Sequence, residues 1–227
     1  AANPRTVGVL QSGGPVELPW MAVAPAILQA WYPGQECGNA IADVLFGDAE
    51  PSGRLPQTFP KRWEDNPTRS QDPEVYPGLN GHVRYEEGLF IGYRHYDRQG
   101  LEPMFAFGHG LGYTSFDLSD VQAMATPDGA AVRVTVTNTG ARAGSAVVQL
   151  YVSDLDAPVE RPDRALKGFA KVLLQPQESR DIQIDLPLRA FAYWDVAGRV
   201  WRVCEGRFRI TAGLSSADIR GQTEISM

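Results

Sequence analysis

The chain has 227 residues, of which 43% are hydrophobic and 21% charged, a composition typical of a globular protein that buries a core. Its net charge is −6, and neither half of the chain has an excess of basic residues, which argues against a nucleic-acid partner. No stretch approaches the roughly 20 apolar residues of a membrane span, so we expect no membrane partner. Cys37 and Cys204 have neither disulfide-framework nor metal-motif spacing, and we expect two separate buried thiols.

The first 60 residues have the pattern of an α/β sheet. An apolar run at 6–10 ends in a glycine-rich turn, and a second strand is predicted at 25–31. A helix is expected at 35–46, because its apolar residues share one face; Glu36 lies in its first turn, where the helix dipole favours a carboxylate, and Gly47 follows it. About three strands and one helix cannot cover both sheet faces, so residues 1–60 are predicted to be the C-terminal portion of an α/β domain.

Residues 61–111 are rich in proline, glycine and aromatic residues, and we expect them to form an ordered, extended connecting arm. From residue 112 the pattern changes to alternating short strands, which predicts a β-sandwich over 112–227. About seven strands are expected there, at 115–121, 132–136, 146–152, 166–174, 181–186, 200–204 and 207–212.

Period-two alternation also predicts which side chains of the sandwich are buried. The predicted core residues are Val132, Val134, Val136, Leu150, Ile182, Ile184, Phe208 and Ile210. The densest basic run is interpreted as a solvated strand face and not as a polyanion site; it consists of Arg199, Arg202, Arg207 and Arg209.

Four linked motifs resemble glycoside hydrolase family 3. The first is Trp-Tyr-Pro-Gly-Gln-Glu at 31–36, continued by Gly-Asn-Ala-Ile-Ala-Asp-Val-Leu-Phe-Gly-Asp at 38–48. The others are Pro-Ser-Gly-Arg-Leu-Pro-Gln-Thr-Phe-Pro at 51–60, the run from Arg-Tyr-Glu-Glu-Gly to His-Tyr at 84–96, and Phe-Gly-His-Gly-Leu-Gly-Tyr-Thr at 107–114. Four motifs in one order are far more specific than any one of them.

The resemblance implies a parent enzyme with a (β/α)8 barrel, an α/β sandwich and a fibronectin type III-like domain. This chain would then have a mixed fold class: the C-terminal half of the α/β sandwich followed by an immunoglobulin/fibronectin III-like β-sandwich. It implies a retaining, exo-acting β-glucosidase that hydrolyses terminal non-reducing β-D-glucosyl residues, with two carboxylates about 5–5.5 Å apart. The family's nucleophile is an Asp of the barrel and its acid/base a Glu upstream of 6–10. We therefore expect this chain, which starts without Met inside a domain, to hold no catalytic residue.

Several residues of types that could serve in catalysis are better explained by structural roles. Glu86 and Glu87 would point to opposite faces of an extended segment, so one of them is expected to anchor a turn or pair with Arg94. Ser12 lacks the nucleophile-elbow pattern, and His109 between two glycines is expected to be a loop residue with a packed ring. The glycines after 6–10 lack the dinucleotide spacing, and no cofactor is expected.

Trp20 and Trp31 are the candidate substrate-binding residues. Indole faces can stack on the apolar faces of pyranose rings. The alternative, which we favour, is that both fill the interface beneath the barrel.

Three functions remain open: a β-glycosidase fragment, a carbohydrate-binding or docking module built on the sandwich, and a purely structural brace. A binding module would show an exposed aromatic row on one sheet face, and the aromatic residues after 112 mostly fall at core-facing positions. We favour the structural role for this piece and the glycosidase for the parent. β-Glucoside is the favoured substrate, with β-xyloside as the alternative.

The expected partners are the glucoside or oligosaccharide substrate, bound through the parent enzyme, and the missing barrel and α/β half. The sequence leaves homo-oligomerisation open. A periplasmic or secreted parent is favoured over a cytoplasmic one.

Overall fold

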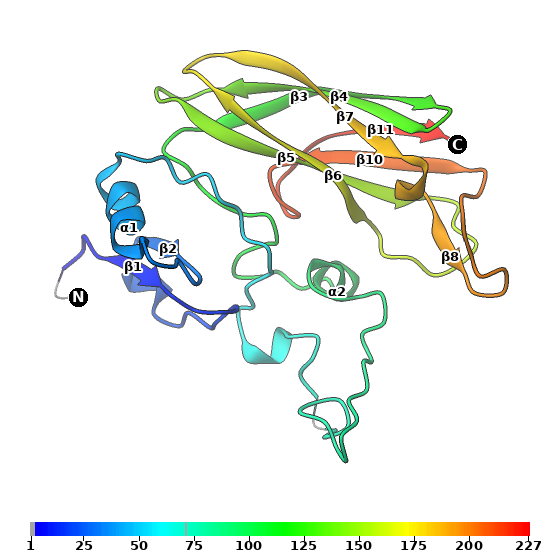
Figure 1. Cartoon of the computed structure of the whole chain (residues 1–227), viewed down its shortest axis with the longest axis horizontal. Helices are drawn as coiled ribbons and strands as arrows, with labels where there is room; N and C mark the ends of the chain where they lie inside the picture. The colour runs from blue at the N-terminus through cyan, green and yellow to red at the C-terminus, as the bar shows by residue number, and fades with distance from the viewer. Residues whose placement is uncertain (1–2, 71) are drawn as a thin grey trace.

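The structure is a computed structural model that describes residues 3–70 and 72–227 (Figure 1). None of the helices in these ranges is long and apolar enough to cross a lipid bilayer. The helices are α1 (Cys37–Phe46) and α2 (Tyr93–Gln99), with 3-10 turns at Met21–Val23, Trp63–Asp65 and Leu188–Ala190. The strands are β1 (Val7–Leu10), β2 (Ala26–Gln29), β3 (Phe116–Thr126), β4 (Gly129–Asn138), β5 (Gly144–Asp154), β6 (Ala165–Leu174), β7 (Ser179–Pro187), β8 (Tyr193–Asp195), β9 (Val200–Arg202), β10 (Arg207–Gly213) and β11 (Ile219–Ser226).

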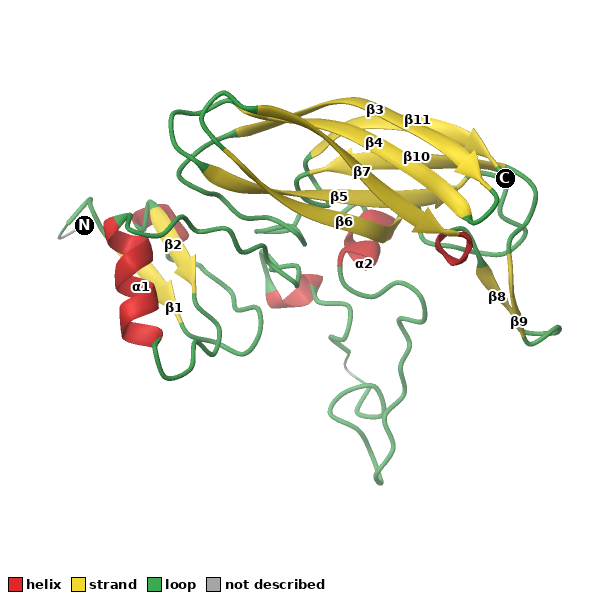
Figure 2. Cartoon of the chain, turned by 45° about the horizontal axis from the view of Figure 1, so that its top comes forward, coloured by secondary structure: helices red, strands yellow, loops and turns green. Residues whose placement is uncertain are grey.

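The C-terminal half is a β-sandwich, as the alternation predicts. One sheet has the order β11-β10-β5-β6, and the other has the order β3-β4-β7. Figures 1 and 2 show the two sheets stacked face to face with their strands running along the long axis of the molecule. The predicted mixed fold class is confirmed.

The core lies between these two sheets. Seven of the eight predicted core residues are buried, and Ile182 is half-buried and packs against the same cluster. The alternation works here because β4 and β5 are central strands whose inward side chains have no access to water.

One of the expected sandwich strands was wrong, and one sandwich strand was missed. Residues 200–204 do not contribute a sandwich strand, because β9 pairs only with β8 in a separate two-stranded ribbon. The seventh strand is β11, which the sequence did not reveal. It is an edge strand in which only Ile225 is buried, so its apolar signal is weak.

The N-terminal unit consists of β1, β2 and α1. β1 and β2 pair in parallel, with Val9 opposite Leu28. The described residues therefore contain two strands there and not three. α1 begins after Glu36, which is the N-cap and not a first-turn residue, and ends at Gly47 in the left-handed conformation (φ 86°).

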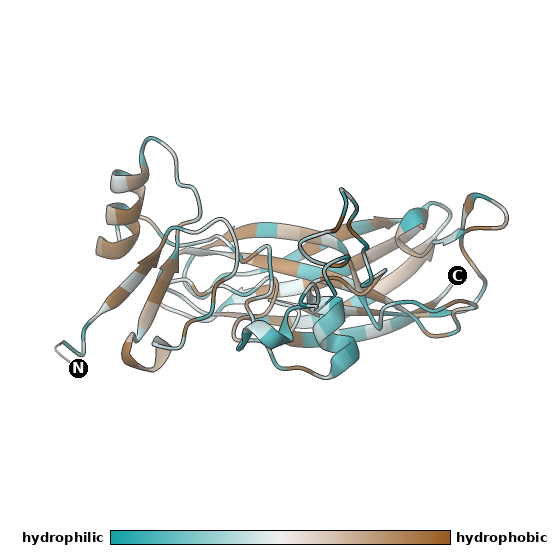
Figure 3. Cartoon of the chain, turned by 90° about the horizontal axis from the view of Figure 1, so that it is seen from below, coloured by the Kyte–Doolittle hydropathy of each residue, from teal (hydrophilic) through white to brown (hydrophobic). Residues whose placement is uncertain are grey.

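This unit exposes much of its apolar surface. α1 has no buried residue, and Phe46 is 85% exposed. Val7 and Val9 on β1 are exposed, and Ile27 and Leu28 on β2 are half-buried. Figure 3 shows hydrophobic segments along α1 and the two strands, away from the sandwich. These side chains have no covering layer in the described part of the chain.

The connecting segment contains a helix that the sequence did not predict. α2 is short, but it buries Tyr93 and Tyr96 three positions apart on one face. Tyr93 stacks on Phe107 with ring centroids 5.1 Å apart, and its hydroxyl accepts a hydrogen bond from the Leu166 N–H (2.8 Å). α2 thereby fixes the arm to β6.

A second set of contacts joins the N-terminal unit to the sandwich. The Glu50 carboxylate accepts a hydrogen bond from the Ser145 N–H (3.0 Å), and a side chain at Gly112 or Gly144 would collide with that carboxylate. Arg142 donates to the Gly47 carbonyl at the end of α1 (2.8 Å). The glycines here allow the two segments to approach closely, so the N-terminal part of the chain meets the sandwich through polar contacts at 47–54.

Candidate functional site

Trp20 lies at the turn that precedes the Met21–Val23 3-10 helix. Its ring covers the backbone of β1, because a Cβ placed on Gly8 would lie 3.2 Å from the Trp20 ring. The side chain remains 37% exposed. Trp20 is therefore a partly open aromatic surface beside β1.

Trp31 follows β2 and is half-buried. It meets the Phe59 ring edge-on with centroids 6.2 Å apart, and Phe59 meets Phe105 in the same way. Its φ of 53° is a left-handed conformation, which is a true outlier for so bulky a residue. Such outliers concentrate at functional sites, because the surrounding structure must hold them. Among the described contacts, none joins Trp31 to Trp20.

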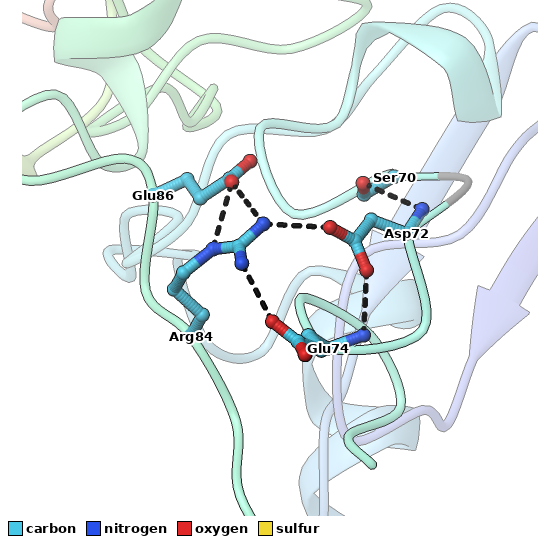
Figure 4. Close-up of polar contacts among 5 residues, drawn as sticks. All are labelled: Ser70, Asp72, Glu74, Arg84 and Glu86. Carbon is cyan, nitrogen blue, oxygen red and sulfur yellow. Dashed lines mark hydrogen bonds and ion pairs between the residues drawn. The ribbon is translucent and has the colours of Figure 1, made fainter.

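Glu86, one of the two neighbouring glutamates that the sequence singled out, belongs to an ion-pair cluster and not to a catalytic pair (Figure 4). Glu86 accepts from Arg84 (2.7 Å), and among the described contacts neither Glu86 nor Glu87 pairs with Arg94, one of the two roles expected for them. The same guanidinium binds Asp72 (2.6 Å) and Glu74 (2.7 Å). Arg94 instead donates to the Leu89 carbonyl, and the Glu87 carbonyl accepts the Phe90 N–H in a turn.

The carboxylates of this cluster all pair with the same cation, Arg84. The pKa of Asp72 is lowered, first by the hydrogen bond from the Glu74 N–H and then by Arg84. The pKa of Arg84 is raised, chiefly by its hydrogen bond to Glu86. A general acid needs a raised carboxyl pKa, so the arrangement suits a brace for the loop. Sequence reasoning missed this brace because Asp72 and Glu74 lie 12 and 10 positions from Arg84.

The remaining candidates have structural partners. Ser12 donates to the Gly14 carbonyl (2.9 Å). The His109 ring stacks on Phe105 with centroids 5.5 Å apart, as expected of a packed ring, and burial lowers its pKa. Both cysteines are free, but they are half-buried and not fully buried. No group of three His, Cys, Asp or Glu residues within 3–70 and 72–227 could hold a metal ion.

Two hollows lie at the base of the arm. The larger, of about 440 Å³, is lined mainly by apolar residues that include Pro15, Trp63, Ile91 and Phe107. The smaller, of about 280 Å³, is lined by residues that include Asp97, Arg164 and Ser216. Thr58 borders both hollows, and its buried Oγ1 has no partner in the described part of the chain. No sequence signal marks these hollows, because their walls come from distant segments.

Two known protein families match this chain. The glycosyl hydrolase family 3 C-terminal domain matches residues 1–113, and the fibronectin type III-like domain matches residues 146–216. Together these matches include the N-terminal unit, the arm and the part of the sandwich from β5 to β10.

Curated relatives and solved structures agree with these matches. A β-glucosidase of Rhizobium radiobacter is 51% identical over 99% of this chain, and thermostable β-glucosidase B of Acetivibrio thermocellus is 45% identical over 94%. The chain spans 28% of the length of each. The structure of DesR, a β-glucosidase from Streptomyces venezuelae, matches with a TM-score of 0.95 at 38% identity, over 100% of this chain and 29% of that one. The chain therefore belongs to glycoside hydrolase family 3, with the fold of that family's C-terminal and fibronectin type III-like domains.

Proposed function

We propose that this chain is the C-terminal part of a retaining, exo-acting β-glucosidase that hydrolyses terminal non-reducing β-D-glucosyl residues. The observation that carries the proposal is the match to β-glucosidases over nearly the whole chain, at up to 51% identity among the relatives described above. Within that enzyme the chain is a structural part and supplies neither the nucleophile nor the acid/base. The electrostatics of the Arg84 cluster support this role, because its carboxylates neutralise a cation.

The proposal also assigns a covering layer to the N-terminal unit. Residues 1–60 form the C-terminal portion of the α/β sandwich, 61–111 the connecting arm and 112–227 the fibronectin type III-like domain. The exposed apolar residues of β1 and α1 then pack against the upstream half of the α/β sandwich, and the barrel supplies most of the sugar pocket.

We expect the purified chain alone not to hydrolyse 4-nitrophenyl β-D-glucopyranoside, because a retaining mechanism needs both carboxylates. Adding the separately produced upstream segment of the parent is expected to restore turnover of the glucoside. The aryl β-xyloside serves as the matched substrate control and is expected to react more slowly. Enzyme-like turnover by the chain alone, with contaminating glucosidase excluded, would contradict the structural role.

The sequence favoured an interface role for Trp20 and Trp31; with the structure described, we propose instead that both contact sugar in the assembled enzyme. The open face of Trp20 and the strained backbone of Trp31 support this assignment. In the parent, Trp31→Ala is expected to lower kcat/KM by about tenfold, which corresponds to the loss of one aromatic stacking contact. Trp63→Ala removes an exposed tryptophan of the arm; it is the control and should leave kcat/KM unchanged. An equal kcat/KM for Trp31→Ala and the parent would refute the assignment of Trp31, and Trp20→Ala tests Trp20 in the same way.

A further inference from the structure

The β8–β9 ribbon stands apart from both sheets of the sandwich. It pairs only with itself, and Trp194 and Trp201 lie directly opposite each other across its two strands. Figures 1 and 2 place the ribbon at the end of the sandwich remote from β1, β2 and α1. Neither tryptophan fills the core, in contrast to the core-facing positions that the alternation assigned to most aromatic residues of this half.

The two indole rings are exposed yet held in place. Trp194 is 45% exposed and Trp201 is 44% exposed. Their ring centroids are 5.6 Å apart with planes inclined by 62°, and the Arg189 guanidinium lies 3.9 Å from the Trp201 centroid. Arg189 covers one face of Trp201, and nearly half of that side chain still remains exposed. Rings that are already held lose little conformational freedom when a ligand binds.

The charges around the ribbon disfavour a polyanion. Of the basic run at 199–209, Arg202 pairs with Asp195 (3.0 Å), Arg207 with Asp156 (3.2 Å) and Arg209 with Glu224 (3.0 Å). These pairs neutralise most of the local positive charge. The Asp195–Arg202 pair, whose residues directly follow Trp194 and Trp201, is still partly exposed and offers hydrogen-bond donors and acceptors, which suits a neutral ligand with many hydroxyl groups.

We propose that Trp194 and Trp201 form a binding site for a soluble β-linked glucan chain. The C–H faces of a β-glucosyl ring suit the indole faces, while its equatorial hydroxyls reach the Asp195–Arg202 pair. The choice of a glucan rests on the proposed function. Because the ring planes are inclined, a bound chain must twist between them. The site therefore suits a flexible soluble glucan and not the flat surface of crystalline cellulose.

The test measures binding by the whole 227-residue chain and needs no hydrolysis. In affinity electrophoresis, soluble mixed-linkage β-glucan in the gel is expected to retard the chain. Cello-oligosaccharides should shift the indole N–H resonances of Trp194 and Trp201. Trp194→Ala and Trp201→Ala are each expected to weaken binding by about tenfold, and the double variant to abolish the retardation. Trp63→Ala, on the arm, should bind normally.

A melting temperature of the double variant equal to that of the unchanged chain confirms that the fold survives, since the ribbon lies outside the core. If the double variant melts early, Trp201→Phe, which keeps an aromatic face, should still bind. Three results overturn the proposal: no retardation of the unchanged chain, retardation that survives the double substitution, or a preference for xylan or crystalline cellulose. Failure of the upstream segment to restore hydrolysis bears on the proposed function alone.

Discussion

Val134→Asp is expected to lower the free energy of unfolding by about 4 kcal/mol or more, because it buries a carboxylate without a partner. Val134 is fully buried in the centre of β4, which is hydrogen-bonded to β3 on one side and β7 on the other. Ile182 lies directly opposite Val134 on β7, and the facing sheet closes the core. Val134 has no exposed surface and its cluster consists of apolar side chains, so the protein must unfold or neutralise the acid.

Arg133→Asp is the matched control, since Arg133 is the adjacent residue on the same strand and its side chain is exposed. It places the same carboxylate in water and should change the stability by less than about 0.5 kcal/mol. Urea unfolding monitored by tryptophan fluorescence measures both variants. Equal midpoints for Val134→Asp and Arg133→Asp would show that the alternation of β4 does not specify the core.

The buried residues of the sandwich were predictable where a strand has one buried face and one solvent-exposed face. On β4, Val132, Val134 and Val136 alternate with polar residues, and all three are buried. The same alternation gave a wrong prediction for β9. Its sequence is strand-like, but β9 pairs only with β8 and all of its residues are exposed. Local pattern reports strand propensity, whereas membership of a sheet depends on long-range pairing.

The arm was less predictable because tertiary contacts determine its structure. α2 has only seven residues, too few for a reliable helical period, and it is stabilised by burying two tyrosines. The Glu86–Arg84 pair is close in sequence, but the cluster needs Asp72 and Glu74 from a different part of the loop. Pairing with Arg94 was one of the two roles expected of Glu86 or Glu87, and Arg94, on α2, donates to the Leu89 carbonyl instead.

Asn138 has one feature that the sequence predicts and one that only tertiary contacts determine. The Asn-Thr-Gly sequence at 138–140 predicts a turn after β4, and β4 does end there. What the sequence does not show is that Asn138 is fully buried. Its Oδ1 accepts from Thr114 (2.6 Å) and Gly140 (3.0 Å), and its amide donates to the carbonyls of Arg142 (2.7 Å) and Leu174 (3.2 Å). The side chain ties three segments together.

The second large effect is expected in hydrogen exchange: amides of β1, β2 and α1 should exchange at least about a thousandfold faster than those of β4 and β5, a difference of about 4 kcal/mol in opening free energy. An isolated pair of strands is marginal in water, and here each strand has four residues. α1 adds little, because none of its residues is buried.

The structure also predicts where protection begins. The Leu55 N–H donates to the His109 carbonyl (2.8 Å) and the Phe59 N–H to the Phe105 carbonyl (2.8 Å), so residues near 55–59 are held by the segment that leads into the sandwich. Protection should therefore rise between Gly47 and Leu55. β4, in the same molecule, is the internal reference.

The same exposed surface should make the chain self-associate as its concentration rises, because unpaired strand edges and apolar side chains seek partners. Phe46→Ser removes the most exposed apolar side chain of α1 and is expected to reduce that association while leaving the melting of the sandwich unchanged. Exchange is measured in a dilute monomer and association by light scattering. Protection across residues 7–46 as strong as that of β4, in a monomer, would mean that the N-terminal unit is stable without a covering layer. The proposed upstream half of the α/β sandwich would then lose its physical basis.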